Sequence, residues 1–270
     1  MSTNIHPGSV LFITLDSCRY DSFVSAHAPN FHAAGHIHKA DAPSYFTYAS
    51  HAAMFVGFTP GVTYEPVPLL NPKFGKIFKL AGAGFPGKGG EGFLLEGRNI
   101  IDGFNRLGYC TIGTGGVGWF DPSTPTSKVL IGDFKEFFYP GNGHSLPDQL
   151  SWIDRCLEAV NETPVFVFLN IGETHVPYYF KGAPWPAHDN PCVPFQLADR
   201  SEECRKRQIC CIEFVDRQIA GLLNRFLEVT TLVTADHGDC WGEDGLWEHG
   251  ISHPMTLSVP LVLRIRGRII

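Results

Sequence analysis

Short uncharged runs that end at polar residues are the feature that most constrains the fold of this chain. Residues 9–15 (SVLFITL) lead directly into Asp16, and similar apolar runs occupy residues 165–169 (VFVFL) and 229–233 (VTTLV). Such runs predict strands that are buried on both faces, as in a parallel sheet. The carboxyl ends of parallel strands share one edge, so the polar residues that follow these runs are expected to lie close together.

Helical patterns alternate with these strands. The sequence predicts helices near residues 45–56, 99–107, 147–160 and 201–226, and further strands at 109–112 and 260–265. This alternation predicts an α/β fold with a doubly wound, mostly parallel sheet and helices on both faces. We expect a single domain over residues 1–270, in which segments rich in Pro and Gly at about 60–96 and 181–199 form loops that cover the site.

Two stretches are expected to be irregular. Residues 22–43 are rich in histidine, and the spacing of these histidines has no clear ligand geometry, which favours a solvated loop: His27, His32, His36 and His38. Four glycines follow the strand at 109–112, at positions 113, 115, 116 and 118. They match no phosphate-binding motif, so a plain turn is favoured over a phosphate cradle.

The composition is that of an ordinary globular protein. The 270 residues are 44% hydrophobic and 18% charged, with a formal net charge of -6 at pH 7. Basic residues neither dominate nor cluster, so we expect no nucleic-acid partner. No run approaches the roughly 20 apolar residues that span a bilayer, and residues 1–7 lack a signal-peptide pattern. We therefore expect no membrane partner and a cytoplasmic location, while the oligomeric state stays open.

The cysteines give a further indication of the environment. All eight are scattered along the chain without C-x-x-C spacing. In a chain of this size, that distribution predicts reduced and mostly buried thiols rather than a disulfide framework.

Polar residues at the expected strand ends suggest a metal site. Asp16, Asp236 and His237 follow apolar runs, and Thr47 lies near the start of the first expected long helix. Carboxylate and imidazole ligands suit Zn²⁺ or Mn²⁺, and the imidazole argues against Mg²⁺. A divalent cation would lower the pKa of the threonine hydroxyl and so activate a poor nucleophile. The helix N-terminus would offer free N–H groups to phosphate oxygens.

Two more imidazoles are expected at the same edge. His175 comes shortly after the run at 165–169, and His249 lies twelve positions beyond His237, after a Gly-rich loop. Both are candidates for catalysis, and each could instead be a structural histidine fixed by its loop.

Simpler roles are compatible with some of these residues. Asp16 could be a helix cap at the end of its strand, and Thr47 could be the N-cap of its helix, since both residue types cap well. The pair of Asp236 and His237 could mark only a turn. For His51, one helical turn after Thr47, the spacing is compatible with a place in the site and equally with packing.

Taken together, these motifs resemble the alkaline phosphatase/sulfatase superfamily. The segments that carry the resemblance occur in the same order as in that family: Thr14–Arg19 around Asp16, Thr47 followed by Ala49–Ala52 and Gly57, His175–Tyr178, Asp236–Gly238, and His249–Gly250. The nearest match is the sulfatase-like branch that includes the catalytic domains of lipoteichoic-acid synthase and phosphoethanolamine transferases. The resemblance implies an alkaline-phosphatase-like fold.

The resemblance also implies roles for individual residues. The principal metal would be bound by four of them: Asp16, Thr47, Asp236 and His237. Thr47 would be the nucleophile, while His175 and His249 would contact the transferred group or hold a second metal. The membrane transferases of this branch carry transmembrane helices that this chain lacks.

The nucleophile segment separates two kinds of ester. Sulfatases have a Cys or Ser that is oxidised to formylglycine within C/S-x-P-x-R, whereas this chain has Thr47-Tyr48-Ala49-Ser50-His51. Threonine cannot form that aldehyde, which favours phosphoric over sulfuric esters. We therefore expect a metal-dependent hydrolase of small-molecule phosphoric esters. Three alternatives stay open: transfer to an alcohol acceptor, sulfuric-ester hydrolysis, and a metal- or ligand-binding module without turnover.

Overall fold

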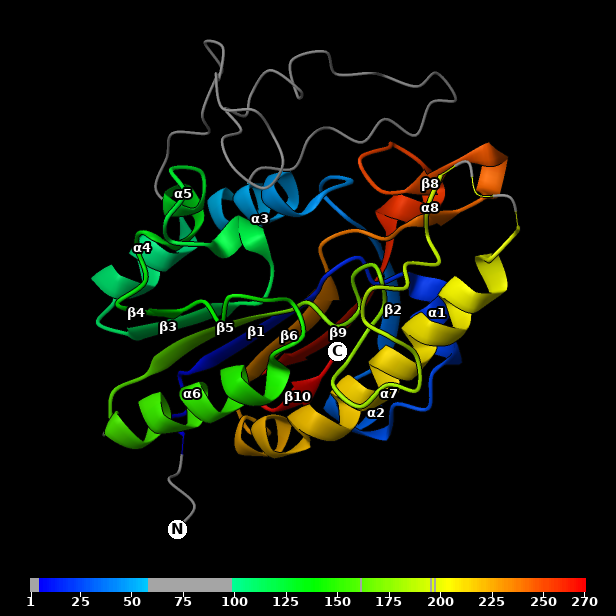
Figure 1. The fold of residues 1–270 in the computed structure, drawn as a ribbon. Coiled ribbons are helices and arrows are strands. Elements are labelled where there is room, and N and C mark those ends of the chain that lie inside the picture. Colours follow the sequence, from blue (N-terminus) through cyan, green and yellow to red (C-terminus); the bar gives the residue numbers. More distant parts are fainter. Residues whose placement is uncertain (1–4, 58–98, 161, 195, 197) are drawn as a thin grey trace, which may run out of the picture.

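A sheet of eight strands organises the described part of the chain, which in this computed structural model comprises residues 5–57, 99–160, 162–194, 196 and 198–270 (Figure 1). The strand order is β10-β9-β6-β1-β5-β3-β4, and β2 pairs with β9. The bounds are β1 Val10–Leu15, β2 Ile37–Asp41, β3 Cys110–Gly115, β4 Glu136–Phe138, β5 Val165–Ile171, β6 Thr230–Ala235, β9 Ser258–Ile265 and β10 Arg268–Ile269. A separate pair comprises β7 Cys240–Trp241 and β8 Trp247–Glu248.

The pairing confirms the predicted α/β architecture. The five strands that lie side by side in the order β4, β3, β5, β1 and β6 are parallel. Strand β9 runs antiparallel to β6, β2 and β10. Strand β1 lies at the centre, where Leu15 is in register with Ile171 of β5 and with Ala235 of β6. The residues that follow these three strands are therefore brought side by side.

Helices cover both faces of the sheet, as predicted (Figure 1). On one face lie α1 Tyr20–Ser25, α2 Pro29–Ala34, α6 Leu146–Ala159 and α7 Ser201–Arg225. On the other lie α3 Thr47–Val56, α4 Ile100–Arg106 and α5 Ser127–Ile131. The short α8 Pro254–Leu257 and the 3₁₀ turns η2 Gly118–Phe120 and η3 Glu243–Gly245 complete the regular elements that the structure describes.

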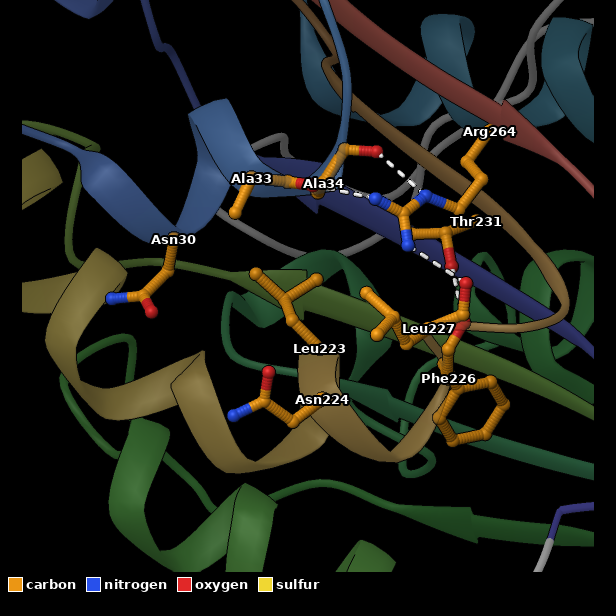
Figure 2. Close-up of a pocket in the computed structure, with 9 residues that line it drawn as sticks. All are labelled: Asn30, Ala33, Ala34, Leu223, Asn224, Phe226, Leu227, Thr231 and Arg264. Atoms are coloured by element: carbon orange, nitrogen blue, oxygen red, sulfur yellow. Dashed lines mark hydrogen bonds between the residues drawn. The ribbon is translucent and has the colours of Figure 1, made fainter. Parts of the chain in front are cut away.

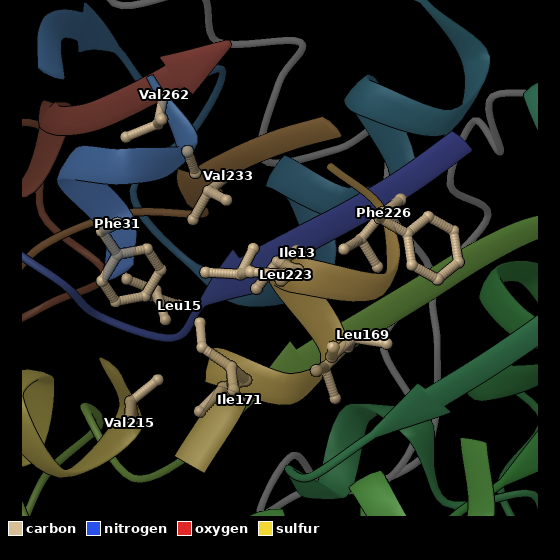
Figure 3. Packing of buried hydrophobic residues seen from close by; sticks show 14 of the residues in the cluster. Ile13, Leu15, Phe31, Leu169, Ile171, Val215, Leu223, Phe226, Val233 and Val262 are labelled. Carbon is tan, nitrogen blue, oxygen red and sulfur yellow. The ribbon is translucent and has the colours of Figure 1, made fainter. Parts of the chain in front are cut away.

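The two cores differ in chemistry because the side chains of each strand alternate between the faces. Leu11, Ile13 and Leu15 of β1 pack under α6 and α7 in a largely aliphatic core (Figure 3). Phe12 faces the other way into an aromatic core with Phe168, beneath α3. Full burial of such a side chain contributes roughly 1.5 to 3 kcal/mol.

Helix α3 ends where the sequence predicts and begins two residues later than predicted, at Thr47. Phe46 precedes it in an extended conformation, and Gly57 ends it with φ 74°, a left-handed conformation that suits glycine. Ala49, Ala52 and Ala53 are buried, and such small side chains let the helix approach the sheet closely. This packing fixes Thr47, the first residue of α3, at the carboxyl edge of the sheet.

Residues 22–43 are not the irregular loop that their histidines suggest. They form the end of α1, α2 and β2, because Phe23 and Phe31 are fully buried against α7 while His32 and His38 stay on the solvent side. The local pattern is weak because each element is short.

The predicted turn at the four glycines is also wrong for two of them. Gly113 and Gly115 lie inside β3. A Cβ atom on Gly115 would come within 2.2 Å of the Phe120 ring, and one on Gly113 within 2.7 Å of Phe137. These glycines make room for aromatic rings.

Two predictions about the chain as a whole are not settled by the fold. The expected covering loop at about 60–96 lies outside the described residues, so the single-domain organisation of residues 1–270 stays a prediction. Among the helices of the described residues, none combines the length and the apolar character that crossing a bilayer requires.

Candidate active site

The central strands bring the predicted acidic residues together. Asp16 follows β1, Asp236 follows β6, and both are fully buried. The backbone N–H of Ser17 donates to Asp236 Oδ1 over 3.1 Å, which ties the two strand ends to each other. His237 Nε2 lies 3.6 Å from Asp236 Oδ2 and 3.9 Å from Asp16 Oδ1. Two carboxylates and an imidazole therefore face one point.

Thr47 reaches the same point from α3, which covers the face of the sheet opposite to α6 and α7. Its Oγ1 lies 3.5 Å from Asp16 Oδ2 and 3.3 Å from His237 Nε2. Thr47 is the first helical residue of α3 and not its N-cap, which is Phe46. Asp16 is not a cap either, since the helix after β1 is preceded by Arg19. The capping alternatives for both residues are thus contradicted.

The carboxylates lack compensating charge. Asp236 Oδ2 has no hydrogen-bond partner among the described residues. Burial, and then the nearby Asp16 carboxylate, raise the pKa of Asp236 well above its usual range. Gathering such groups away from water is unfavourable unless a cation joins them.

The imidazole is in the form that a metal requires. Burial lowers the pKa of His237 to about 3, so the ring is neutral. Its Nδ1–H donates to the Gly238 carbonyl over 3.0 Å, which leaves the lone pair of Nε2 directed at the carboxylates. Asp16, Asp236 and His237 form one of the groups whose ligand atoms lie within 4.8 Å of one another. This donor set fits Zn²⁺ or Mn²⁺.

A second group adds Asp239, a residue that the motif reading did not single out. Asp239, His237 and His249 also offer ligand atoms within 4.8 Å of one another. His249 Nδ1 donates to Asp239 Oδ1 over 2.7 Å. Burial opposes protonation of His249, but the Asp239 carboxylate outweighs it and raises the pKa of His249. The carboxylate thus orients the imidazole as in a His–Asp pair.

Aromatic side chains hold Asp239 in turn. The Tyr178 hydroxyl donates to Asp239 Oδ2 over 2.7 Å, and Trp241 Nε1 donates to the Tyr178 oxygen over 2.7 Å. Tyr178 belongs to the same sequence segment as His175, residues His175–Tyr178. This segment therefore carries His175 to the site and also holds the Asp239 carboxylate in place. A second Asp after the strand, three positions beyond Asp236, was the available signal for Asp239.

His175 lies at the rim of the site. Its Nδ1 donates to the Val176 carbonyl over 2.7 Å, and its Nε2 lies 3.9 Å from Asp16 Oδ1. The ring centroids of His175 and His237 lie 5.1 and 4.5 Å from that of His249. All residues predicted for the site thus meet at one place: Asp16, Thr47, His175, Asp236, His237 and His249. Their individual roles stay predictions.

Gln208 of α7 supports the loops that carry these residues. Its Nε2 donates to the carbonyls of Ser17 and Thr174 over 2.8 and 3.1 Å, and its Oε1 accepts from the Arg19 N–H over 3.2 Å. Thr174 Oγ1 then donates to the Asp16 carbonyl over 2.7 Å. A fully buried glutamine on an amphipathic helix is the only local hint of this role.

An ionic cluster borders the site. The Arg19 guanidinium bonds to Asp21 at 2.7 Å and to Glu243 at 2.6 Å, and it stacks over Trp241 with 4.0 Å to the ring centroid. Here each charge has a partner of opposite sign.

The loop expected at 181–199 is anchored by a similar cluster. Asp189 accepts from Arg200 at 2.8 Å and from Arg207 of α7. The side-chain hydrogen bonds from Arg200 and then Arg207 hold the pKa of Asp189 well below its usual range. Arg207 also stacks over Trp185 at 5.1 Å, so this loop is fastened to α7.

A small recess lies away from the site, between α2, α7 and the start of β6 (Figure 2). The Arg264 guanidinium donates to the carbonyls of Ala34 over 3.0 Å and of Leu227 over 2.7 Å. Its donors are thus used by the backbone, which is a structural arrangement.

Comparison with known proteins reveals similarity in structure. No protein-family model and no curated protein matches the sequence. The C-terminal periplasmic domain of phosphoethanolamine transferase EptC from Campylobacter jejuni aligns over 96% of this chain and 80% of its own length, with TM-score 0.61 and 13% identity. The equivalent domain of Escherichia coli EptC, in complex with Zn, aligns over 97% and 74%, with TM-score 0.64 and 12% identity.

A third structure comes from a different kind of enzyme. Phosphonate monoester hydrolase of Agrobacterium radiobacter aligns over 97% of this chain and 70% of its own, with TM-score 0.60 and 14% identity. A protein in the alkaline phosphatase superfamily from Vibrio parahaemolyticus also matches, with TM-score 0.53. The chain has an alkaline-phosphatase-like fold. At these identities the comparisons establish the fold, and the resemblance drawn from the motifs is confirmed at that level.

Proposed function

We propose that this protein is a metal-dependent enzyme that cleaves small-molecule phosphoric esters with Thr47 as nucleophile. The observation that carries the proposal is the position of the Thr47 hydroxyl, 3.3 Å from His237 Nε2 and 3.5 Å from Asp16 Oδ2, beside carboxylates without compensating charge. A hydroxyl on the first residue of a helix also lies near the positive end of the helix dipole, which suits phosphate oxygens.

Asp16, Asp236 and His237 would hold the principal divalent cation, with Thr47 as the fourth ligand. When bound, a cation of this kind lowers the pKa of a coordinated hydroxyl and offsets negative charge on the phosphoryl group. We favour Zn²⁺ or Mn²⁺ because of the imidazole. As the alternative to the proton-transfer role of His249 given below, His249 and Asp239 would hold a second cation, in keeping with the close approach of their ligand atoms to His237.

The first step follows from the position of the hydroxyl. Thr47 Oγ1 loses its hydrogen to solvent and attacks phosphorus, the bond from phosphorus to the ester oxygen breaks, and the leaving alcohol oxygen takes a proton from His249 Nε2. Asp239 holds the Nδ1–H of His249, so Nε2 is the nitrogen of this ring that can exchange a proton with the ester or with water. His175, at the rim, is placed to contact non-bridging oxygens.

The second step restores the enzyme. Water attacks the phosphothreonine and gives a proton to His249 Nε2, and the bond between phosphorus and Thr47 Oγ1 breaks. Thr47 Oγ1 regains a proton from solvent, and the phosphate product leaves with the oxygen of water. Hydrolysis and transfer differ only in the acceptor at this step. Transfer to an alcohol is the second candidate, favoured by the fold similarity to phosphoethanolamine transferases. Sulfuric-ester hydrolysis is disfavoured by threonine at position 47.

The test combines elemental analysis with an activity panel. The purified protein, loaded with Zn²⁺ or Mn²⁺, is assayed on phosphomonoesters, phosphodiesters and sulfate esters, with and without added alcohols. We expect turnover of a phosphoric ester, a stoichiometric metal, and at least a roughly 1,000-fold loss of kcat in Thr47→Ala. Thr47→Ser, which keeps the hydroxyl, is the control.

The outcomes separate the alternatives. Full activity of Thr47→Ala would exclude the covalent step. Products that carry the added alcohol would assign a transferase. Bound metal without turnover of any ester would favour a binding module. The cytoplasmic location and the absence of a membrane or nucleic-acid partner stay predictions.

A further inference from the structure

We propose that His51 is a positioning residue that fixes the nucleophile Thr47, as the last link of a buried hydrogen-bond chain running from β5 through β1 to the start of α3. This inference rests on the proposed function, because it concerns the same nucleophile. His51 is four residues after Thr47 on α3, and its role was left open by the sequence.

Three hydrogen bonds form the chain. Asn170 Nδ2 of β5 lies 3.3 Å from Thr14 Oγ1 of β1. The same oxygen of Thr14 lies 2.9 Å from His51 Nε2. His51 Nδ1 lies 2.8 Å from the Thr47 carbonyl oxygen. All four residues, Asn170, Thr14, His51 and Thr47, are at most 1% exposed, so water does not compete for these bonds.

The chemistry of the groups fixes the direction of each bond. A carbonyl oxygen can only accept, so His51 Nδ1 carries the hydrogen that goes to Thr47. In a neutral ring Nε2 is then the acceptor, and Thr14 must donate its hydroxyl hydrogen to it. The Thr14 oxygen in turn accepts from the Asn170 amide. One neutral tautomer of His51 satisfies every partner.

The surroundings favour that neutral ring and hold it still. The ring of His51 meets Phe55, Phe120 and Phe168 edge to face, with centroids 6.0, 5.2 and 5.7 Å away. Because the ring cannot turn without breaking the chain and displacing these contacts, its bond to Thr47 has one geometry.

This geometry matters for the nucleophile. The Thr47 side chain must direct Oγ1 at the cluster of Asp16 and His237, and that direction depends on the orientation of the first residue of α3. The first turn of a helix is where fraying is easiest. By joining the Thr47 carbonyl to the sheet, His51 removes that freedom at the residue whose orientation the reaction requires.

The test compares three variants. His51→Leu removes both bonds, whereas His51→Asn places an amide nitrogen near the position of Nδ1 and can still donate to Thr47. Ser50→Ala is the matched control, because Ser50 is equally buried on α3 and bonds to the Ser44 carbonyl at 3.1 Å but not to Thr47. Each is measured in the metal-loaded full chain, with the melting temperature as a check on folding.

We expect kcat to fall about 10- to 100-fold in His51→Leu, with KM changed less than about threefold. His51→Asn should recover at least several-fold of that loss, and Ser50→Ala should stay within about threefold of the wild type. A His51→Leu variant that is as active as Ser50→Ala would overturn the proposal. Equal impairment of His51→Leu and His51→Asn would overturn it as well.

A readout besides activity separates this inference from the proposed function. Titration with Zn²⁺ or Mn²⁺ should show affinity about 3- to 10-fold weaker in His51→Leu than in the wild type, because a displaced Thr47 is a poorer ligand. Wild-type protein that turns over no ester would reject the proposed function alone. Unchanged metal affinity in His51→Leu would reject the positioning role.

A second variant guards against a folding failure of His51→Leu. Thr14→Val is similar in shape and breaks the chain one link earlier. It should lower kcat by a few-fold. If the bonds act as a chain, the loss in the double variant Thr14→Val with His51→Asn should be smaller than the two single losses combined. Additive effects would contradict the inference.

Discussion

Two clusters of charge, one partly exposed and one fully buried, lie within a few residues of each other, and they are built on opposite rules. Around Arg19, the guanidinium has Asp21 and Glu243 as ionic partners and the Trp241 ring as a platform. Around Asp236, a second carboxylate and two neutral groups gather, and Oδ2 has no hydrogen-bond partner among the described residues.

The contrast separates charged residues that stabilise the fold from charged residues that are candidates for binding a ligand. The chain can supply cations near the sheet edge, since Arg19 is only three positions after Asp16, yet it directs that charge away from Asp16 and Asp236. A buried carboxylate pair left without a protein cation is costly, so its persistence indicates a ligand of positive charge. The Arg19 cluster, in contrast, is complete without any ligand.

The largest effect should come from the incomplete cluster. Asp236→Asn is expected to weaken Zn²⁺ or Mn²⁺ binding at least about 100-fold and to lower turnover about 1,000-fold, because a charged ligand is lost. In the presence of a chelator, the same variant should be about 1 kcal/mol more stable than the wild type, because repulsion from Asp16 is removed. Metal titration, kinetics and urea denaturation measure these quantities.

Both directions are needed for the interpretation. Weak metal binding together with unchanged or raised stability of the metal-free protein is the signature of a site. If Asp236→Asn instead unfolds the metal-free protein, the carboxylate serves the fold, and the contrast between the two clusters fails.

Arg19→Met should show the opposite pattern. It removes the ionic partner of Glu243 and the nearer partner of Asp21, which keeps Arg205 at 3.6 Å. Since the side chains of Asp21 and Glu243 are 37% and 30% exposed, the loss should be about 2 kcal/mol in the free energy of unfolding. Metal affinity should stay within about threefold. Arg106→Met is a control for surface pairs, because Arg106 is 57% exposed and its bond to Asp102 should contribute less than about 0.5 kcal/mol.

A smaller effect with a distinct pH dependence is expected at Asp189. Its pKa is lowered by hydrogen bonds first from Arg200 and then from Arg207, so its contribution to stability is present above the unfolded value of 3.8 and is lost as the pH falls toward the lowered folded value. Asp189→Asn should lower the free energy of unfolding by about 1 kcal/mol at pH 7.

The difference between the two proteins should shrink as the pH falls below about 4. Denaturant titrations at pH 7, 4 and 3 provide the comparison. A constant difference across this range would mean that Asp189 acts through packing and not through its charge.

Much of the fold and the convergence of the site could be predicted from the sequence. The uncharged strands signal burial locally, and parallel pairing then brings Asp16, Asp236 and His237 to one edge without any knowledge of contacts. The place of Thr47 near the start of α3 could be predicted because the sequence marks the end of that helix clearly at Gly57. The family motifs added the expected nucleophile and the two outer histidines.

The parts that were missed depend on contacts between distant segments. Gln208 bonds to Ser17, 191 positions earlier, and Asp239 bonds to the hydroxyl of Tyr178, 61 positions earlier. The role of His51 depends on Thr14 in another element, so spacing alone left it undecided. Short elements such as β2 were missed because their stability comes from pairing with β9 and not from local preference.

The central position of β1 has a consequence for how the molecule folds. Ser17, the residue after Asp16, bonds to the carboxylate of Asp236, which lies 219 positions further along the chain. Contacts of such separation form late because a long loop must close first. We therefore expect the proposed affinity for metal to arise only when β6 docks beside β1. In a refolding experiment, the time course of cation uptake would report when the sheet is completed.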